Sequence, residues 1–125
     1  MRPARLFWQI IFSFTLFTIL VSCDSKRDIQ VEVSNQGSLT VRGVQVTFDN
    51  STFEYGELSP GIYAVNHSVP LPSKGSAVVV WTDVNDKSQS ATVAIPDIRN
   101  VTRLNALVFE FGATGVVLRL RKLTN

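Results

Sequence analysis

Residues 107–120 read LVFEFGATGVVLRL, and this stretch decides the fold class. Leu107, Phe109 and Phe111 are separated by single residues, so their side chains point to one face of an extended chain. The same period of two returns over 116–120, and the segment GATG between the two runs is rich in turn-forming residues. The pattern predicts a β-hairpin with one apolar face.

The chain from residue 29 onward repeats this pattern. Further runs with apolar residues at every second position, separated by turn residues, cover 29–33, 52–58, 62–69 and 90–95. Residues 77–81 are continuously apolar, which indicates a strand at a sheet centre or one covered on both faces. No sustained helical period occurs, although 97–104 allows one helical turn. We therefore expect an all-β fold, an antiparallel β-sandwich of about seven or eight strands.

The period of two slips by one residue inside 39–48. Its apolar positions are odd at first and even later, and they are Leu39, Val41, Val44, Val46 and Phe48. A β-bulge at Gly43 absorbs the extra residue and keeps all five side chains inward. A strand that passes from one sheet to the other is the alternative explanation.

Two shorter segments carry local predictions. Residues 35–38, Asn-Gln-Gly-Ser, are predicted to form a turn, because Asn and Gly tolerate positive φ. Along the strand at 62–69, strict alternation places four side chains on one face: Tyr63, Val65, His67 and Val69.

The first 22 residues differ from the rest. Arg2 and Arg5 precede a long apolar run without charges, which is the layout of a secretory signal. The run ends Leu20-Val21-Ser22-Cys23. Here the chain resembles bacterial lipoproteins, whose lipobox has an aliphatic residue, a small or aliphatic residue, a small residue and then cysteine.

This resemblance implies a covalent lipid on the Cys23 sulfur, cleavage before Cys23 and acylation of the new amino terminus. Two or three acyl chains hold a protein stably on a bilayer. The implied location is the periplasmic or extracellular face of a cell membrane, and Asp24 resembles the signal for inner-membrane retention in enteric-type lipoproteins. We expect no other cofactor.

The resulting division of the chain is a signal peptide at 1–22, a lipidated cysteine with a short tether at 23–28, and the β-sandwich at 29–123. Five tether residues reach at most about 17 Å, so the body is expected to lie close to the membrane. An uncleaved signal anchor and a secreted eukaryotic protein are the alternatives. Three glycosylation sequons, at Asn50, Asn66 and Asn100, fit the latter.

Charge and cysteine content exclude other classes. Of the 12 Lys and Arg residues, Arg2 and Arg5 lie in the leader, which leaves ten against ten Asp and Glu. A formally neutral body argues against a nucleic-acid partner, because such binding needs an excess of positive charge. With Cys23 as the single cysteine, the body cannot form an internal disulfide.

Catalysis is not expected. His67 is the single histidine, with Ser68, Asp49 or Asp83 as its candidate partners in a hydrolase, and no G-x-S-x-G segment is present. One imidazole cannot build a transition-metal site. Residues 83–86 (DVND) offer carboxylates for calcium but lack the glycine and distal glutamate of an EF-hand, so a hairpin turn is the simpler interpretation.

Two groups of side chains are candidates for a binding surface. Phe53, Tyr55 and Tyr63 are candidates for an exposed aromatic platform for sugars or peptides, or for core residues. Arg119 and Arg121 share one strand face, either as solvated edge charges or as contacts for an acidic partner or lipid headgroups. We expect a non-catalytic lipoprotein that contacts another envelope protein, with a carbohydrate- or peptide-binding module as the alternative.

Overall fold

The computed structural model describes residues 28–73 and 75–124, so the predictions for residues 1–22, Cys23 and Asp24 fall outside the described residues. Eight strands make up this part of the chain: β1 Asp28–Asn35, β2 Val41–Phe48, β3 Ser51–Leu58, β4 Tyr63–Pro70, β5 Gly75–Thr82, β6 Ser88–Ile95, β7 Leu104–Gly112 and β8 Gly115–Lys122. No described segment forms a helix that is long and apolar enough to cross a bilayer.

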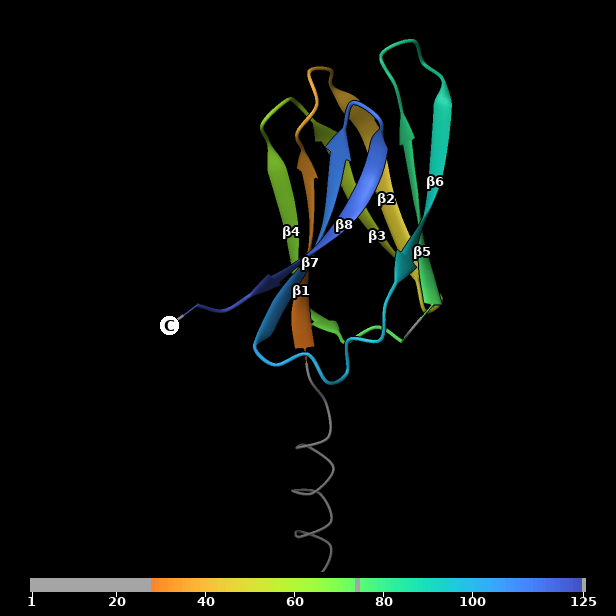
Figure 1. Cartoon of the computed structure of the whole chain (residues 1–125). Helices are drawn as coiled ribbons and strands as arrows, with labels where there is room; N and C mark the ends of the chain where they lie inside the picture. The colour runs from red at the N-terminus through yellow and green to blue at the C-terminus, as the bar shows by residue number, and fades with distance from the viewer. Residues whose placement is uncertain (1–27, 74, 125) are drawn as a thin grey trace, which may run out of the picture.

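The strands form two sheets of four that pack face to face (Figure 1), in the orders β4-β1-β7-β8 and β3-β2-β5-β6. All neighbours pair antiparallel except β1 and β7, which run parallel. Three hairpins stay within a sheet, and the other four connections pass between sheets. The predicted all-β sandwich is confirmed, and the parallel pair is a feature that the alternation pattern did not predict.

The core lies between the sheets and comes from the predicted alternating positions. From β7, Leu107, Phe109 and Phe111 are all at most 4% exposed. They belong to one continuous apolar cluster that includes Ile29, Val31, Val33, Val44, Val46, Phe48, Ala77, Val79 and Ile95. As predicted, β5 is a central strand, but its outer face is open, because Val78 is exposed.

The predicted bulge at Gly43 is confirmed. Gly43 has a φ of 57°, and the pairing of β2 with both neighbours shifts register across it. Val41 and Val44 therefore both face the core. The expectation for Leu39 is wrong, because β2 begins only at Val41 and Leu39 lies exposed in the connection between the sheets.

A second bulge, at Ser68, overturns the predicted face of β4. Ser68 has a φ of 58°, and the pairing of β4 with β1 shifts register between Ile29 and Val31. Val69 is consequently buried in the core, whereas Tyr63, Val65 and His67 line a groove on the outer face of the sheet. The extra residue moves Val69 to the opposite face.

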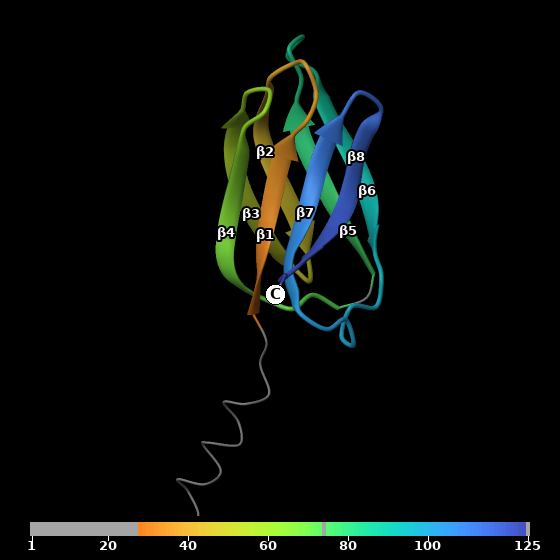
Figure 2. The ribbon, with the colours of Figure 1, turned by 60° about the vertical axis from the view of Figure 1, so that its left-hand side comes forward.

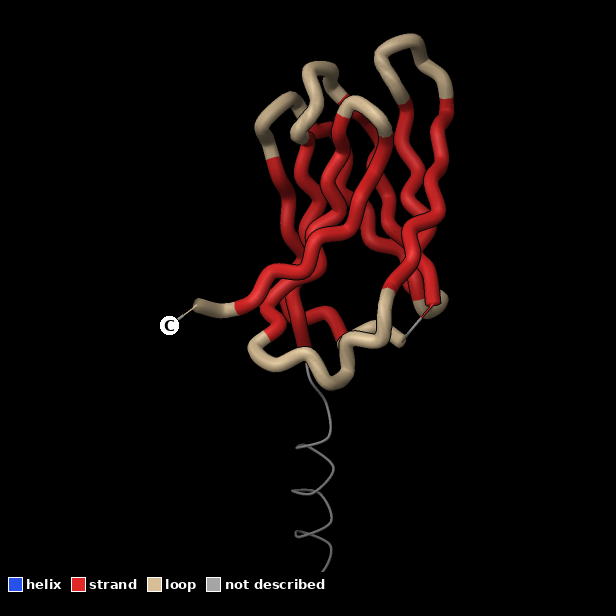
Figure 3. Tube along the Cα trace, viewed as in Figure 1, coloured by secondary structure: helices blue, strands red, loops and turns tan. Residues whose placement is uncertain are grey.

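The two ends of the sandwich differ. Odd-numbered strands run away from Asp28 and even-numbered strands run back, so four connections gather at the end opposite Asp28 (Figures 2 and 3). We call this the distal end; its connections are 36–40, 59–62, 83–87 and 113–114. The segment 97–104 lies at the other end, where the Val101 amide bonds the Ile98 carbonyl at 3.1 Å in a turn rather than a helix.

Candidate functional site

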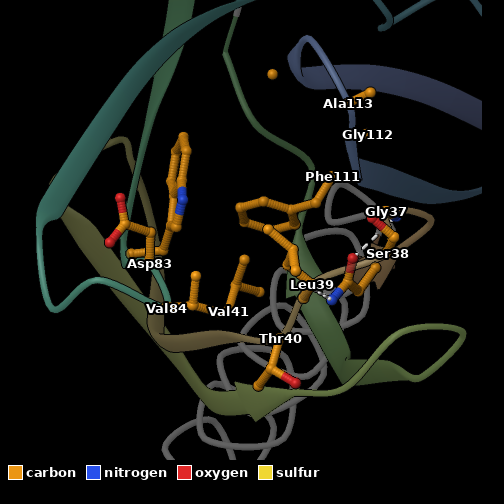
Figure 4. A pocket seen from close by; sticks show the side chains of 13 residues that line it. Gly37, Ser38, Leu39, Thr40, Val41, Asp83, Val84, Phe111, Gly112 and Ala113 are labelled. Atoms are coloured by element: carbon orange, nitrogen blue, oxygen red, sulfur yellow. Dashed lines mark hydrogen bonds between the residues drawn. The ribbon is translucent and has the colours of Figure 1, made fainter.

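A cleft of about 310 Å³ opens at the distal end. One wall comes from the β1–β2 connection with Leu39, another from the start of the β5–β6 connection with Val84, and the third from the β7–β8 hairpin (Figure 4). Trp81 and Phe111 meet edge-to-face within it, with ring centroids 5.0 Å apart. The two aromatic rings give the cleft an apolar lining.

Asn35, the last residue of β1, fixes the walls of this cleft. Its side chain is buried, donates to the carbonyls of Leu39 and Leu58 at 2.9 Å each, and accepts from the Gly37 amide at 3.0 Å. Its main chain also bonds the β3–β4 connection, donating to the Ile62 carbonyl. Asn35 is therefore a long-range brace between two distal connections. The predicted turn at 35–38 is instead a bend at 37–39 in the connection between the sheets, and neither Asn35 nor Gly37 adopts a positive φ.

The β5–β6 connection is held by a different set of hydrogen bonds. The Asp83 carboxylate accepts from the Gln89 side chain and from the Lys87 and Asn85 amides, at 2.9–3.0 Å. These hydrogen bonds, led by that from Gln89, lower the pKa of Asp83. The predicted hairpin turn is confirmed. No group of three described His, Cys, Asp or Glu residues is placed to hold a metal ion.

Exposed apolar side chains gather at the distal end, and two of them, Leu39 and Val84, line the cleft. Among the described residues, seven large hydrophobic side chains are exposed, and Leu39, Ile62 and Val84 lie in three different distal connections. Tyr63 and Val117, at the distal ends of β4 and β8, belong to the same seven. A small domain gains stability by burying such groups, so five of seven at one end point to a contact surface.

A second depression, about 510 Å³, lies on the outer face of the β4-β1-β7-β8 sheet. Across its floor, Arg121 of β8 donates to the Glu32 carboxylate at 3.1 Å and to the Gln30 side chain at 3.2 Å. Only 7% of the Glu32 side chain is exposed. Tyr63 and His67 of β4 line the opposite side. We call this depression the outer groove.

The predicted aromatic platform does not form. Phe53 and Tyr55 pack against the core, whereas Tyr63 is 64% exposed on the other sheet. The Tyr55 hydroxyl donates to the Val31 carbonyl across the sandwich at 2.9 Å, and burial raises the pKa of Tyr55 above its ordinary range. Core packing explains the first two residues, and only Tyr63 remains available to a ligand.

The predicted basic group does share one face, but its charges are paired. Arg119 bonds Glu110 of the neighbouring strand at 2.6 Å, and Arg121 bonds Glu32. Both arginines thus act as cross-strand partners within the sheet. Their pairing leaves less free charge for an acidic partner or for headgroups.

His67 lines a depression of about 220 Å³ together with Asp28 and Ser68. Within the described residues no hydrogen bond links its imidazole to either group. The positive φ of Ser68 follows from the bulge. Of the other predicted acids, Asp49 accepts from the Ser73 amide, and Asp83 lies at the distal end. These residues therefore do not form the hydrogen-bonded chain that a nucleophile needs.

The sequence did not identify Asn35, Gln30 or Glu32 as site residues. Alternation alone signals that Gln30 and Glu32 face outward, but not that Arg121, 89 residues later, closes over them. An asparagine at a strand end signals a turn more readily than a brace.

Comparison with known proteins gives information on the fold alone. No protein-family model and no curated protein sequence matches the chain. A protein from Eubacterium rectale, solved by NMR, is similar in structure with a TM-score of 0.50 and 15% identity, over 80% of this chain and 94% of that one. At this identity the likeness shows a shared fold alone.

Proposed function

We propose that this chain is a bacterial envelope lipoprotein whose non-catalytic sandwich contacts another envelope protein. Acyl chains on Cys23 hold it on the periplasmic or extracellular face of a membrane, and Asp24 favours the inner membrane. The support is the Leu20-Val21-Ser22-Cys23 motif at the end of a charge-free apolar run. A second support is that the body has two different ends: Asp28 joins the tether at one end, and the cleft opens at the other.

One observation carries the contact role, namely the exposed apolar residues on three separate distal connections. Leu39 is 60% exposed, Ile62 52% and Val84 49%. The bonds of Asn35 and Asp83 hold the connections that carry them, so little ordering entropy is lost when a partner binds. Apolar side chains on hydrogen-bonded connections at one end of the body suit a protein surface better than a small charged ligand.

The anchor is tested by mass spectrometry of the mature amino terminus from its own cells. We expect the mass of a peptide that starts at Cys23 and carries acyl chains. Cys23→Ser should accumulate as an uncleaved precursor. An unmodified Cys23 thiol, or normal cleavage of the serine variant, would contradict the anchor.

The contact surface is tested by replacing Leu39 with a photo-crosslinking amino acid in living cells. We expect a discrete adduct with one envelope protein, and the unlabelled variant Leu39→Ser should weaken co-purification of that protein. The same replacement at Val78, which is exposed on the outer face of β5, is the matched control. Equal crosslinking at both positions would refute a distal contact site.

A second candidate function rests on the outer groove. Gln30 and Arg121 line it with planar polar groups, buried Glu32 balances the charge of Arg121, and Tyr63 adds an exposed ring. This set suits a neutral polyhydroxylated ligand such as a saccharide. NMR titration with maltose and with chitobiose, compared between the natural chain and Tyr63→Ala, tests it; unchanged outer-groove signals at saturating sugar would exclude it.

A further inference from the structure

Each sheet of a sandwich has two edge strands with unpaired backbone groups. Here the edges are β4 and β8 in one sheet and β3 and β6 in the other. Unprotected edges invite pairing with other chains, and proteins usually block them with charges, prolines or bulges. Comparing the four edges shows which of them is open.

Three of the four edges carry such features. The bulge at Ser68 distorts β4, which ends at Pro70. On β3, the pairing is irregular around Gly56, whose φ is 73°, and the strand carries exposed glutamates. Arg119 and Lys122 place exposed positive charge along β8. Each of these edges is therefore a poor template for another strand.

The fourth edge, β6, lacks all of these features. Its sequence, SQSATVAI, has no charge and no proline. All eight residues pair with β5 in unbroken register, so the strand is regular from Ser88 to Ile95. Its exposed side chains are short, apart from Gln89. No described strand is hydrogen-bonded to its outer edge.

We infer that the free edge of β6 receives an extended, uncharged segment of a different polypeptide, which adds as a fifth strand to the β3-β2-β5-β6 sheet. Main-chain hydrogen bonds supply the affinity in this mode, and alternate side chains supply the selection. Ala91 and Val93 are half-buried toward the core, so the incoming segment needs apolar residues at the positions beside them. Thr92 and Ala94 face solvent and select small or polar ones.

The choice of a different polypeptide, rather than a second copy, rests on the proposed anchor. Two β6 strands that pair antiparallel place the Asp28 ends of the two copies at opposite ends of the joint sheet. Eight strand residues span about 26 Å. The proposed distal contact has the strands standing upright on the membrane. In that arrangement the tether, which reaches at most about 17 Å, cannot anchor both copies in one membrane face.

The probe is a synthetic peptide with the sequence of β5, GSAVVVWT, the strand that β6 already pairs with on its other side. Amide hydrogen exchange of the full chain in detergent micelles is followed by NMR, with and without peptide. We expect slower exchange along β6 and unchanged exchange along β3. A peptide N-methylated at adjacent central residues keeps its side chains but loses main-chain donors, and it should give no protection.

Matched substitutions place the same charge on the two edges of one sheet. Thr92→Lys on β6 should weaken peptide binding about tenfold, whereas Thr52→Lys on β3 should leave it unchanged. If Thr92→Lys unfolds the chain, Ala94→Lys replaces it. No protection at millimolar peptide, or equal protection of β3, would overturn the inference.

Measuring the oligomeric state of the full chain distinguishes a second copy from a different polypeptide as the occupant of the β6 edge. If the full chain is a dimer without peptide and Thr92→Lys makes it a monomer, a second copy is the occupant and our choice is wrong. These results are independent of Cys23 acylation and of the Leu39 crosslink. Failure at β6 with an acylated Cys23 therefore leaves the proposed function standing, and loss of the anchor leaves the peptide result valid.

Discussion

Replacing Asn35 with alanine tests whether the distal end is braced by one side chain. The substitution removes the donors to the Leu39 and Leu58 carbonyls and the acceptor of the Gly37 amide. The bond to Leu58 is buried, so its carbonyl loses its partner without access to water, whereas the other two groups are partly exposed. We expect Asn35→Ala to lower the free energy of unfolding by about 2–4 kcal/mol, most of it from the buried carbonyl.

Urea denaturation of the full chain in micelles, followed by circular dichroism, measures this loss. With a slope of about 1–3 kcal/mol per molar urea, the expected loss lowers the midpoint by roughly 0.7–4 M. Asn85→Ala is the control, because Asn85 is exposed in a distal connection and only its backbone amide is bonded. If the two variants unfold at the same midpoint, Asn35 does not brace the distal end.

A charged variant at the same position adds a pH test. Asn35→Asp keeps the shape but turns a carboxylate oxygen toward two carbonyls, so the folded state favours the protonated acid and raises its pKa. The pKa of this aspartate is about 4 in the unfolded state and higher in the folded state. The variant therefore keeps its stability below pH 4 and loses part of it as the pH rises through the pKa of the folded state. We therefore expect Asn35→Asp to be more destabilised, relative to the natural chain, at pH 7 than at pH 3.

Three further substitutions test other parts of the fold by the same denaturation assay. Tyr55→Phe removes the hydrogen bond from the Tyr55 hydroxyl to the Val31 carbonyl and should cost about 1 kcal/mol at pH 7. Because burial raises the pKa of Tyr55, the natural chain should lose stability as the pH rises past about 10, and this loss should vanish in the variant. Gly43→Ala should cost about 1 kcal/mol through its positive φ although the space around it is open; no loss would contradict the bulge. Arg121→Gln should cost about 1–2 kcal/mol by leaving Glu32 buried without a counter-charge, and a second change, Glu32→Gln, should recover part of that loss; additive effects would mean that the pair is not coupled.

The sequence predicted those parts of the fold that depend on side-chain period alone. Alternation at 107–111 and 116–120 identified β7 and β8 and their inward faces. The bulge at Gly43 could be predicted because apolar residues lie on both sides of it. They occupy odd-numbered positions before Gly43 and even-numbered positions after it. Burial needs one face to be apolar throughout, so a visible slip requires an extra residue, and glycine adopts the positive φ most easily.

The bulge at Ser68 was not readable, because Tyr63, Val65, His67 and Val69 alternate without a slip, and serine is not a residue that favours positive φ. The bulge therefore depends on partners elsewhere. β1 must bury Ile29 against Val69, while Val65 pairs beside Glu32 on the outer face. The same limit applies to the distal brace, since the Leu58 carbonyl that Asn35 binds is 23 residues away. The outer groove and the distal cleft thus depend on contacts between residues far apart in the sequence. For this reason the period of apolar residues predicted the strands but not the surfaces that we propose for contact.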